Sequence, residues 1–267
     1  METMSAGPTT EAELREQMAE LGRRLHQQGF VAATDGNLSV RLENGNIMTT
    51  PTNMSKGMCC AADMIVVDRA GKKVSGQRNA STELAMHLLI YNLRPDVNGI
   101  VHAHPPTATG FAAAGMSLNK ALISEVVLSL GSVPLARYGT PGTSELSDAL
   151  RDLVPHFDAI LMANHGVVTF GEDLIKAYFH METVEHFARI SLVTEMLGKQ
   201  VLLSRQDVQK LLEARSRYYG SAGGAIHTCE PLAADSETHA LSRFSLLQED
   251  FRKFLEDTIR KLKMWPA

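Results

Sequence analysis

The chain has 267 residues, of which 44% are hydrophobic and 21% are charged, and its formal net charge at pH 7 is −4. This length favours one large domain, and the composition excludes a mainly disordered chain and a low-complexity fibre. The small negative charge predicts no general affinity for nucleic acid or for an anionic membrane surface.

The cysteines and the apolar segments bear on the compartment in which the protein works. Cys59, Cys60 and Cys229 are too few for a disulfide framework in a chain of this size, which favours a reducing compartment. No uncharged apolar stretch approaches the length of a membrane span, and residues 1–10 lack the pattern of a secretion signal. We therefore expect a cytoplasmic protein whose partner is a small-molecule substrate, with no membrane and no nucleic acid.

The first half of the chain predicts one helix followed by short strands. Thr10-Glu11-Ala12-Glu13 has the spacing of a capping box and predicts a helix over 10–28. An Asn-Gly pair at 44–45 predicts a hairpin between its flanking strands. The elements expected up to residue 114 are strands at 37–41, 46–50, 64–67 and 99–103 and helices at 82–93 and 106–114.

The second half predicts more strands and then two long helices. The strands are expected at 133–137, 159–163 and 167–170, and the helices at 172–198 and 204–219. Because strands and helices alternate irregularly, the pattern predicts an α/β protein of the α+β type with a mixed sheet flanked by helices. We expect this domain to span residues 1–220, and residues 221–267 to form a linker and an amphipathic helical extension near 241–263.

Histidines at predicted strand ends are the strongest chemical signal. His102 and His104 are two residues apart at the end of a strand, so both side chains are expected on one face. Alone, this pair is more often a structural feature with satisfied hydrogen bonds. His165 follows another strand, and Glu83 lies near the start of a helix, where the helix dipole favours a carboxylate. Three imidazoles with one open position are typical of a catalytic zinc site.

Five motifs occur in an order and spacing that resemble the class II aldolase/adducin family. They are Gly36-Asn37-Leu38-Ser39-Val40-Arg41, Thr50-Pro51-Thr52, Ser81-Thr82-Glu83, His102-Ala103-His104-Pro105 and Asn164-His165-Gly166. The resemblance covers about residues 10–220 and includes L-fuculose-1-phosphate aldolases. It implies a mainly antiparallel central sheet and a homotetramer with active sites between subunits.

The resemblance also implies a role for each matching residue. His102, His104 and His165 would bind Zn²⁺ or another divalent metal, and Glu83 would be the catalytic acid/base. Burial beside the metal would raise the pKa of Glu83, although the cation opposes this. Gly36, Asn37, Thr52, Ser81 and Thr82 would hold the substrate phosphate, for which backbone N–H groups and hydroxyl donors suffice. Tyr219 would protonate or orient the leaving aldehyde oxygen.

Departures from the family pattern leave the reaction open. A second aldolase tyrosine is missing near Ser124-Glu125, Asn53 stands where the aldolases have glycine, and Thr82 replaces a serine. The leading hypothesis is a zinc-dependent lyase that cleaves a sugar phosphate resembling L-fuculose 1-phosphate. One alternative is a related metal-dependent decarboxylase, dehydratase or epimerase. Another is a non-catalytic interaction module like the adducin head.

Overall fold

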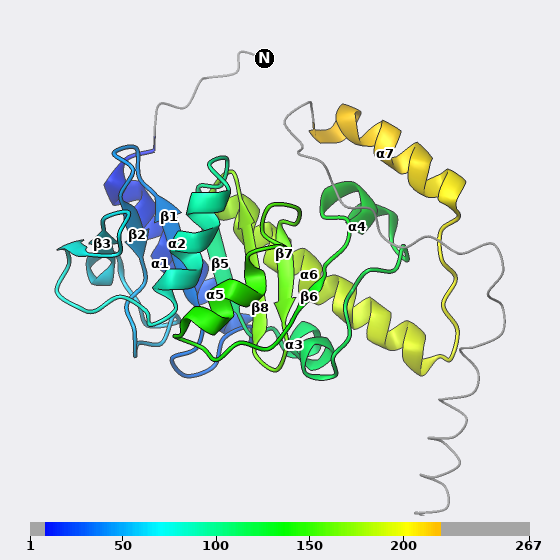
Figure 1. Cartoon of the computed structure of the whole chain (residues 1–267), viewed down its shortest axis with the longest axis horizontal. Helices are drawn as coiled ribbons and strands as arrows, with labels where there is room; N and C mark the ends of the chain where they lie inside the picture. Colours follow the sequence, from blue (N-terminus) through cyan, green and yellow to red (C-terminus); the bar gives the residue numbers. More distant parts are fainter. Residues whose placement is uncertain (1–8, 220–267) are drawn as a thin grey trace, which may run out of the picture.

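The computed structural model describes residues 9–219, which form one eight-stranded sheet with helices on both faces (Figure 1). The helices are α1 (Glu11–Gln27), α2 (Leu84–Leu93), α3 (Pro106–Ala113), α4 (Ser124–Ser129), α5 (Ser144–Leu150), α6 (Leu174–Met196) and α7 (Arg205–Tyr219), and Ala61–Asp63 forms a short 3-10 helix, η1. None of the helices described is long and apolar enough to cross a membrane.

The sheet is mixed and almost entirely antiparallel, as expected. Its strands are β1 (Asn37–Arg41), β2 (Ile47–Thr49), β3 (Ile65–Val67), β4 (Lys73–Ser75), β5 (Gly99–Ala103), β6 (Leu135–Ala136), β7 (Ala159–Met162) and β8 (Gly166–Gly171). Their spatial order is β4-β3-β2-β1-β5-β8-β7-β6, and only the β6–β7 pair is parallel. The strand that carries His102, β5, therefore lies in the middle of the sheet, between β1 and β8.

Each face of the sheet has its own hydrophobic core, because successive strand residues point to opposite faces. Val101 packs into the core formed with α1, α3 and α6, whereas its neighbour Ile100 packs into the core formed with α2 and α5. Strands covered on both faces need apolar residues at successive positions, and all five residues of β5 are buried. This explains the continuous apolar runs that the sequence shows at these strands.

Most predicted elements are confirmed, with shifts of one or two residues at their ends. The capping box of Thr10 and Glu13 is present at the start of α1, and Gly45 adopts a φ of +80° in the β1–β2 hairpin. The strand expected at 133–137 is reduced to two residues, β6. Four short elements were not predicted, namely η1, β4, α4 and α5. The expected extension at 221–267 lies outside the described residues.

Polar side chains on one face of β1 contact polar side chains of α2 and of Glu83, which directly precedes it. The contacts repeat at the same interval along the strand and along the helix. Asn37 Nδ2 donates to Glu83 Oε2 at 2.8 Å, and a 2.6 Å hydrogen bond joins Ser39 Oγ to His87 Nδ1. Two residues of strand advance about 6.6 Å and four residues of helix about 6.0 Å, so the two repeats stay in step over this distance. We call these contacts the β1–α2 polar ladder.

The ladder continues one step further from the histidines. The Tyr91 hydroxyl lies 2.9 Å from Ser39 Oγ, and the Arg41 guanidinium stacks over the Tyr91 ring at 4.8 Å from its centroid. Tyr91 and His87 are buried, so these contacts hold α2 at one height along β1. The ladder therefore sets where α2 begins, and with it the position of Glu83.

Buried His87 makes the protein sensitive to acid. Burial, and then the positive charge of His102, lower the pKa of His87 to about 3, whereas an unfolded chain has a pKa near 6.5. The unfolded state thus binds a proton below pH 6.5 that the folded state refuses until about pH 3, and stability falls as the pH falls through that window.

We expect His87→Asn to reduce this acid sensitivity. One proton costs up to about 1.4 kcal/mol per pH unit below pH 6.5, so the variant's deficit in unfolding free energy should shrink by roughly 2.7 kcal/mol between pH 7.5 and pH 4.5. Urea unfolding of both proteins at the two pH values measures it. The deficit at pH 7.5 reports the lost packing, and an unchanged deficit at pH 4.5 would contradict the role of His87.

Candidate metal centre

Three strands and the start of one helix bring the motif residues together. His102 lies on β5 and pairs with Asn37 of β1 on one side and with Val168 of β8 on the other. His104 follows β5 by one residue, rather than ending the strand. His165 lies in the turn between β7 and β8, and Glu83 directly precedes α2 instead of lying in its first turn.

The three histidines converge on one point. One ring nitrogen from each of His102, His104 and His165 lies within 4.8 Å of the other two. The ring centroids are 4.8 to 5.2 Å apart, with the ring planes inclined to one another by 62° to 67°. Rings inclined in this way can each turn one nitrogen toward a shared centre, whereas rings stacked in parallel cannot. Residues more than sixty positions apart in sequence therefore form one cluster.

The tautomer of His102 is set by a backbone contact. Its Nδ1 lies 2.9 Å from the carbonyl oxygen of Val167, a partner that only accepts hydrogen bonds. Nδ1 therefore carries a proton and donates, which leaves Nε2 facing the cluster. This arrangement is the usual support for a metal-binding imidazole. On the outer side of the cluster, the Asp35 carboxylate lies 3.4 Å from His104 Nδ1.

Two glycines make room for the cluster. A Cβ atom on Gly166 would lie 2.5 Å from His104 Cδ2 and 2.7 Å from the carbonyl oxygen of Ala103. A Cβ atom on Gly36 would lie 2.7 Å from the carbonyl oxygen of His102, and Gly36 has a φ of +68°. Both positions thus need glycine because the backbones approach so closely.

Glu83 forms the fourth side of the cluster. Its Oε2 lies 3.3 Å from His102 Nε2, and its Oε1 lies 3.1 Å from His165 Nε2. Burial opposes ionisation, but the charges of His102 and His165 and the short contacts of both imidazoles outweigh it and hold the pKa of Glu83 far below its usual value. The rise in the pKa of Glu83 that burial alone would cause is therefore not found, because two imidazole nitrogens lie within 3.3 Å of the carboxylate oxygens.

The imidazoles themselves titrate differently. Burial opposes protonation of His102, yet the Glu83 carboxylate reverses this and raises the pKa of His102. For His104, burial and the charges of His102 and His165 lower the pKa to about 4. The cluster thus holds one anionic carboxylate against His102, while His104 stays neutral and available as a ligand at neutral pH.

The geometry of this cluster fits a metal ion. The Nε2 atoms of His102 and His104 are 3.2 Å apart, and two nitrogens bound to a tetrahedral zinc at 2.0–2.1 Å would be separated by about 3.4 Å. Buried Glu83 Oε1 has no hydrogen bond of good geometry from any described residue, although His165 Nε2 is close. A buried carboxylate oxygen without a well-aligned donor, beside three ring nitrogens, is a group that a bound cation would satisfy.

A buried carboxylate on α6 anchors the segment that follows His104. Glu185 is 1% exposed and accepts hydrogen bonds from the backbone N–H groups of Thr107 and Ala108, in the first turn of α3. Arg189, one turn further along α6, pairs with the same carboxylate at 2.8 Å. A negative charge at a helix N-terminus is favourable, so α6 holds α3 and the end of β5 in place.

The residues expected to bind phosphate lie in adjoining segments. Asn37 Nδ2 donates to Ser81 Oγ at 3.2 Å as well as to Glu83, and Ser81 Oγ accepts from the Glu83 backbone N–H. Thr52 joins this region through its backbone N–H, which donates to the carbonyl oxygen of Asn79. Thr82 is exposed, and neither Ser81 nor Thr82 forms a side-chain cap on α2.

Asn53, which replaces the family glycine, adopts a φ of +53°. Asparagine tolerates this left-handed conformation better than most residues, so the turn is preserved without glycine. Tyr219 is the last residue of α7, and its side chain is not among those that the structure describes. Its expected role therefore stays a prediction.

Two charged residues at the site were missed by the sequence analysis. Asp35 precedes Gly36 in the sequence, and an Asp-Gly pair is a turn signal that does not reveal a contact with His104. Lys56 is 1% exposed although its sequence neighbours suggest a polar loop. No periodic pattern marked either residue, because both belong to irregular segments.

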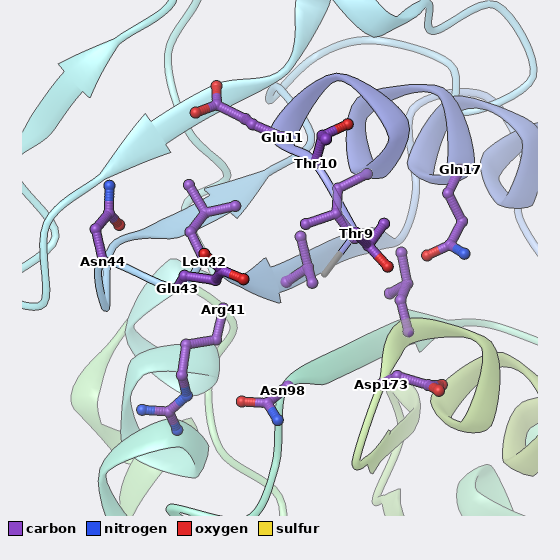
Figure 2. Close-up of a pocket in the computed structure, with 13 residues that line it drawn as sticks. Thr9, Thr10, Glu11, Gln17, Arg41, Leu42, Glu43, Asn44, Asn98 and Asp173 are labelled. Atoms are coloured by element: carbon purple, nitrogen blue, oxygen red, sulfur yellow. The ribbon is translucent and has the colours of Figure 1, made fainter. Parts of the chain in front are cut away.

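A separate cavity of about 950 Å³ lies at the far end of β1, away from the histidines (Figure 2). Its walls come from the start of α1, the end of β1 and the start of α6, and they include Thr10, Glu43 and Asp173. Arg41 turns away from it to donate to the carbonyl oxygens of Val97 and Tyr91. The three clustered histidines are therefore not part of this cavity.

Comparisons with known proteins agree with the geometry. Residues 16–192 match the family described as the class II aldolase and adducin N-terminal domain. A 5-deoxy-D-ribulose 1-phosphate aldolase from Bacillus thuringiensis is 30% identical over 206 residues, which cover 76% of this chain and 96% of that protein. A 3-oxo-tetronate 4-phosphate decarboxylase from Pectobacterium atrosepticum is 32% identical over 212 residues, covering 77% of this chain and 95% of that protein.

A solved structure shows the same fold. YgbL from Klebsiella pneumoniae, described as a putative aldolase/epimerase/decarboxylase, superposes with a TM-score of 0.72 at 32% identity and covers 76% of this chain and 100% of that chain. The family match includes the segments that carry the three histidines and Glu83. The chain belongs to the class II aldolase/adducin family.

Proposed function

We propose that the protein is a zinc-dependent lyase that cleaves a carbon–carbon bond of a sugar phosphate resembling L-fuculose 1-phosphate. The observation that carries this proposal is the convergence of His102, His104 and His165 beside the Glu83 carboxylate. A divalent cation held there supplies positive charge beside the substrate carbonyl oxygen, which favours the negative charge that develops as the bond breaks.

Glu83 is proposed to move the proton in this reaction. When the carbon–carbon bond breaks, its electron pair stays on the carbon next to the carbonyl group, and a proton must then be added to that carbon. Asn37 holds Glu83 Oε2 through a 2.8 Å hydrogen bond, which fixes the direction of the carboxylate. In cleavage, the hydroxyl group that becomes the aldehyde must lose its proton, and Tyr219 is proposed to orient this oxygen and, in the reverse addition, to protonate it.

The substrate phosphate is proposed to lie beside Gly36, Asn37, Thr52, Ser81 and Thr82. Two contacts support this placement, since Asn37 bonds both Ser81 and Glu83 and so links the phosphate residues to the acid/base. The relative from B. thuringiensis acts on a ketose 1-phosphate by its name, which supports a phosphorylated substrate here.

Decarboxylation of a phosphorylated oxo acid is the second candidate. It is favoured by the relative from P. atrosepticum, a 3-oxo-tetronate 4-phosphate decarboxylase. In that reaction the electron pair left by carbon dioxide would be stabilised in the same way, and the same proton transfer would follow. The adducin-like, non-catalytic alternative has less support, because the complete set of three histidines and a carboxylate meets at one point.

Metal binding is tested with the ligands and with the glycine that makes room for them. We expect one zinc ion per chain, lost in His102→Ala. Gly166→Ala should weaken the affinity about tenfold or more, since its Cβ would collide with His104. Metal content by mass spectrometry and competition with a chromogenic chelator measure both.

Gly110→Ala is the matched control for Gly166→Ala. A Cβ on Gly110, which lies in α3, would meet no atom within 4 Å. It should leave the zinc affinity unchanged. Equal affinities for the Gly166→Ala variant and the wild type would contradict the assigned site.

Glu83→Gln tests the acid/base role. Because general acid–base catalysis contributes roughly 10²- to 10⁴-fold, kcat should fall by about that factor while zinc stays bound. The assay incubates the zinc protein with L-fuculose 1-phosphate, 5-deoxy-D-ribulose 1-phosphate and 3-oxo-tetronate 4-phosphate. Dihydroxyacetone phosphate identifies an aldolase, and carbon dioxide identifies a decarboxylase. Glu20→Gln, on the exposed face of α1, should retain full activity.

We also propose the homotetramer that the resemblance implies. The C-terminal half of α6 supports it, because Leu192, Val193 and Met196 are 44 to 61% exposed, as an interface would require. Light scattering should give about four times the chain mass of 29.2 kDa. Glu substitutions at Val193 and Met196 should lower this mass, and a wild-type monomer would contradict the proposal.

A further inference from the structure

Lys56 is a buried cation that the proposed chemistry does not use. Lys56 is 1% exposed. Its Nζ donates hydrogen bonds to the backbone carbonyl oxygens of Thr34 at 3.0 Å and Met54 at 2.5 Å. No carboxylate oxygen of the described residues lies within ion-pairing distance of this ammonium. A charge removed from water without a carboxylate partner is costly, so a structural role alone would be served better by an apolar side chain.

The two carbonyl groups belong to two of the three segments that form the proposed phosphate site. Thr34 lies two residues before Gly36, and Met54 lies two residues after Thr52. Both segments contain backbone in the left-handed region, at Gly36 with φ +68° and at Asn53 with φ +53°. One ammonium therefore clamps two turns that have no regular secondary structure to hold them.

The ammonium also lies within electrostatic reach of the histidine cluster. Burial lowers the pKa of Lys56, and the carboxylates of Asp35 and Glu83 act in the opposite direction. These two carboxylates flank the cluster and would repel an anionic substrate. None of the residues assigned to the phosphate site carries a positive charge, so Lys56 supplies charge that this site otherwise lacks, at low local dielectric.

We infer that Lys56 is a positioning residue for the anionic group of the substrate: it holds the 34–37 and 52–54 turns together and makes the potential at the phosphate site positive. This inference rests on the proposed function, because it requires a substrate with a phosphate or a similar dianion. Lys56 does not touch the reacting carbons and takes no part in the proton transfer.

Lys56→Met tests the inference, because methionine has nearly the same length and no charge. Inorganic phosphate is the probe, and its dissociation constant is measured from the rise in Tm of the zinc-loaded protein. We expect phosphate binding to weaken about tenfold or more in the variant, with its zinc content unchanged. Lys73→Met, at an exposed lysine of β4, is the matched control and should bind phosphate like the wild type.

Kinetics separate the charge from a structural effect. With a phosphorylated ketose, KM should rise about tenfold while kcat stays within about threefold. With the same ketose lacking phosphate, kcat/KM should stay within about twofold, because that substrate has no anion to attract. An equal loss for both substrates would overturn the inference and leave Lys56 with a structural role only.

Two further results would overturn it. Phosphate affinity in Lys56→Met within twofold of the wild type would show that the ammonium has no effect on the anion. Loss of folding in both Lys56→Met and Lys56→Gln would show that the charge is needed for the fold instead. If the wild type itself binds no phosphate but retains zinc, the proposed phosphate substrate fails first, and the two failures are thereby distinguished.

Discussion

The register between β1, β5 and β8 is the constraint on which the site depends. Asn37, His102 and Val168 lie side by side across these three strands, and each strand is hydrogen-bonded along its length. A slip of one residue would turn His102 from one face of the sheet to the other and exchange it for an apolar neighbour. The packing of two cores against both faces makes such a slip very costly, so the hydrophobic pattern of β5 also fixes the chemistry at its end.

The electrostatics of the cluster follow from this enforced proximity. Three imidazoles held within 5 Å of one another cannot all be in the positively charged, doubly protonated form, because the charges repel each other. This repulsion contributes to the low pKa of His104. Glu83 relieves part of it by pairing with His102, which raises the pKa of one imidazole and lowers that of the carboxyl. A divalent cation would take the place of that shared proton and neutralise the same carboxylate. The site is therefore organised around a positive charge even before any metal is considered.

Much of this arrangement could be predicted from the sequence. The strand that carries His102 and the strands that flank His165 were found because buried strands show short apolar runs, and the start of α1 was found from its capping box. Five motifs in order then indicated which polar residues would meet. The length of β6 was wrong, since a strand at the edge of a sheet needs few paired residues, and α4 and α5 were missed because helices of six or seven residues show too little periodicity.

The rest of the site could not be predicted, because it depends on contacts rather than on patterns. The pKa of Glu83 depends on two ring nitrogens within 3.3 Å, which no spacing along the chain reveals. Lys56 looks like a loop lysine until the carbonyl groups around it are known. Asp35 was not singled out, and Asn37 was expected only beside the substrate phosphate, although their side chains contact His104 and Glu83.

The central position of β5 also determines how often this part of the sheet opens locally. His102 is bordered by a hydrogen-bonded strand on each side and has no exposed surface, so its amide belongs to the part of the protein that opens last. Edge strands such as β4, whose three residues are all exposed, will fray and exchange their amide hydrogens much sooner. The strand that carries His102 thus keeps its conformation while the edge strands open locally. The three histidines are therefore already close together before any ion would bind.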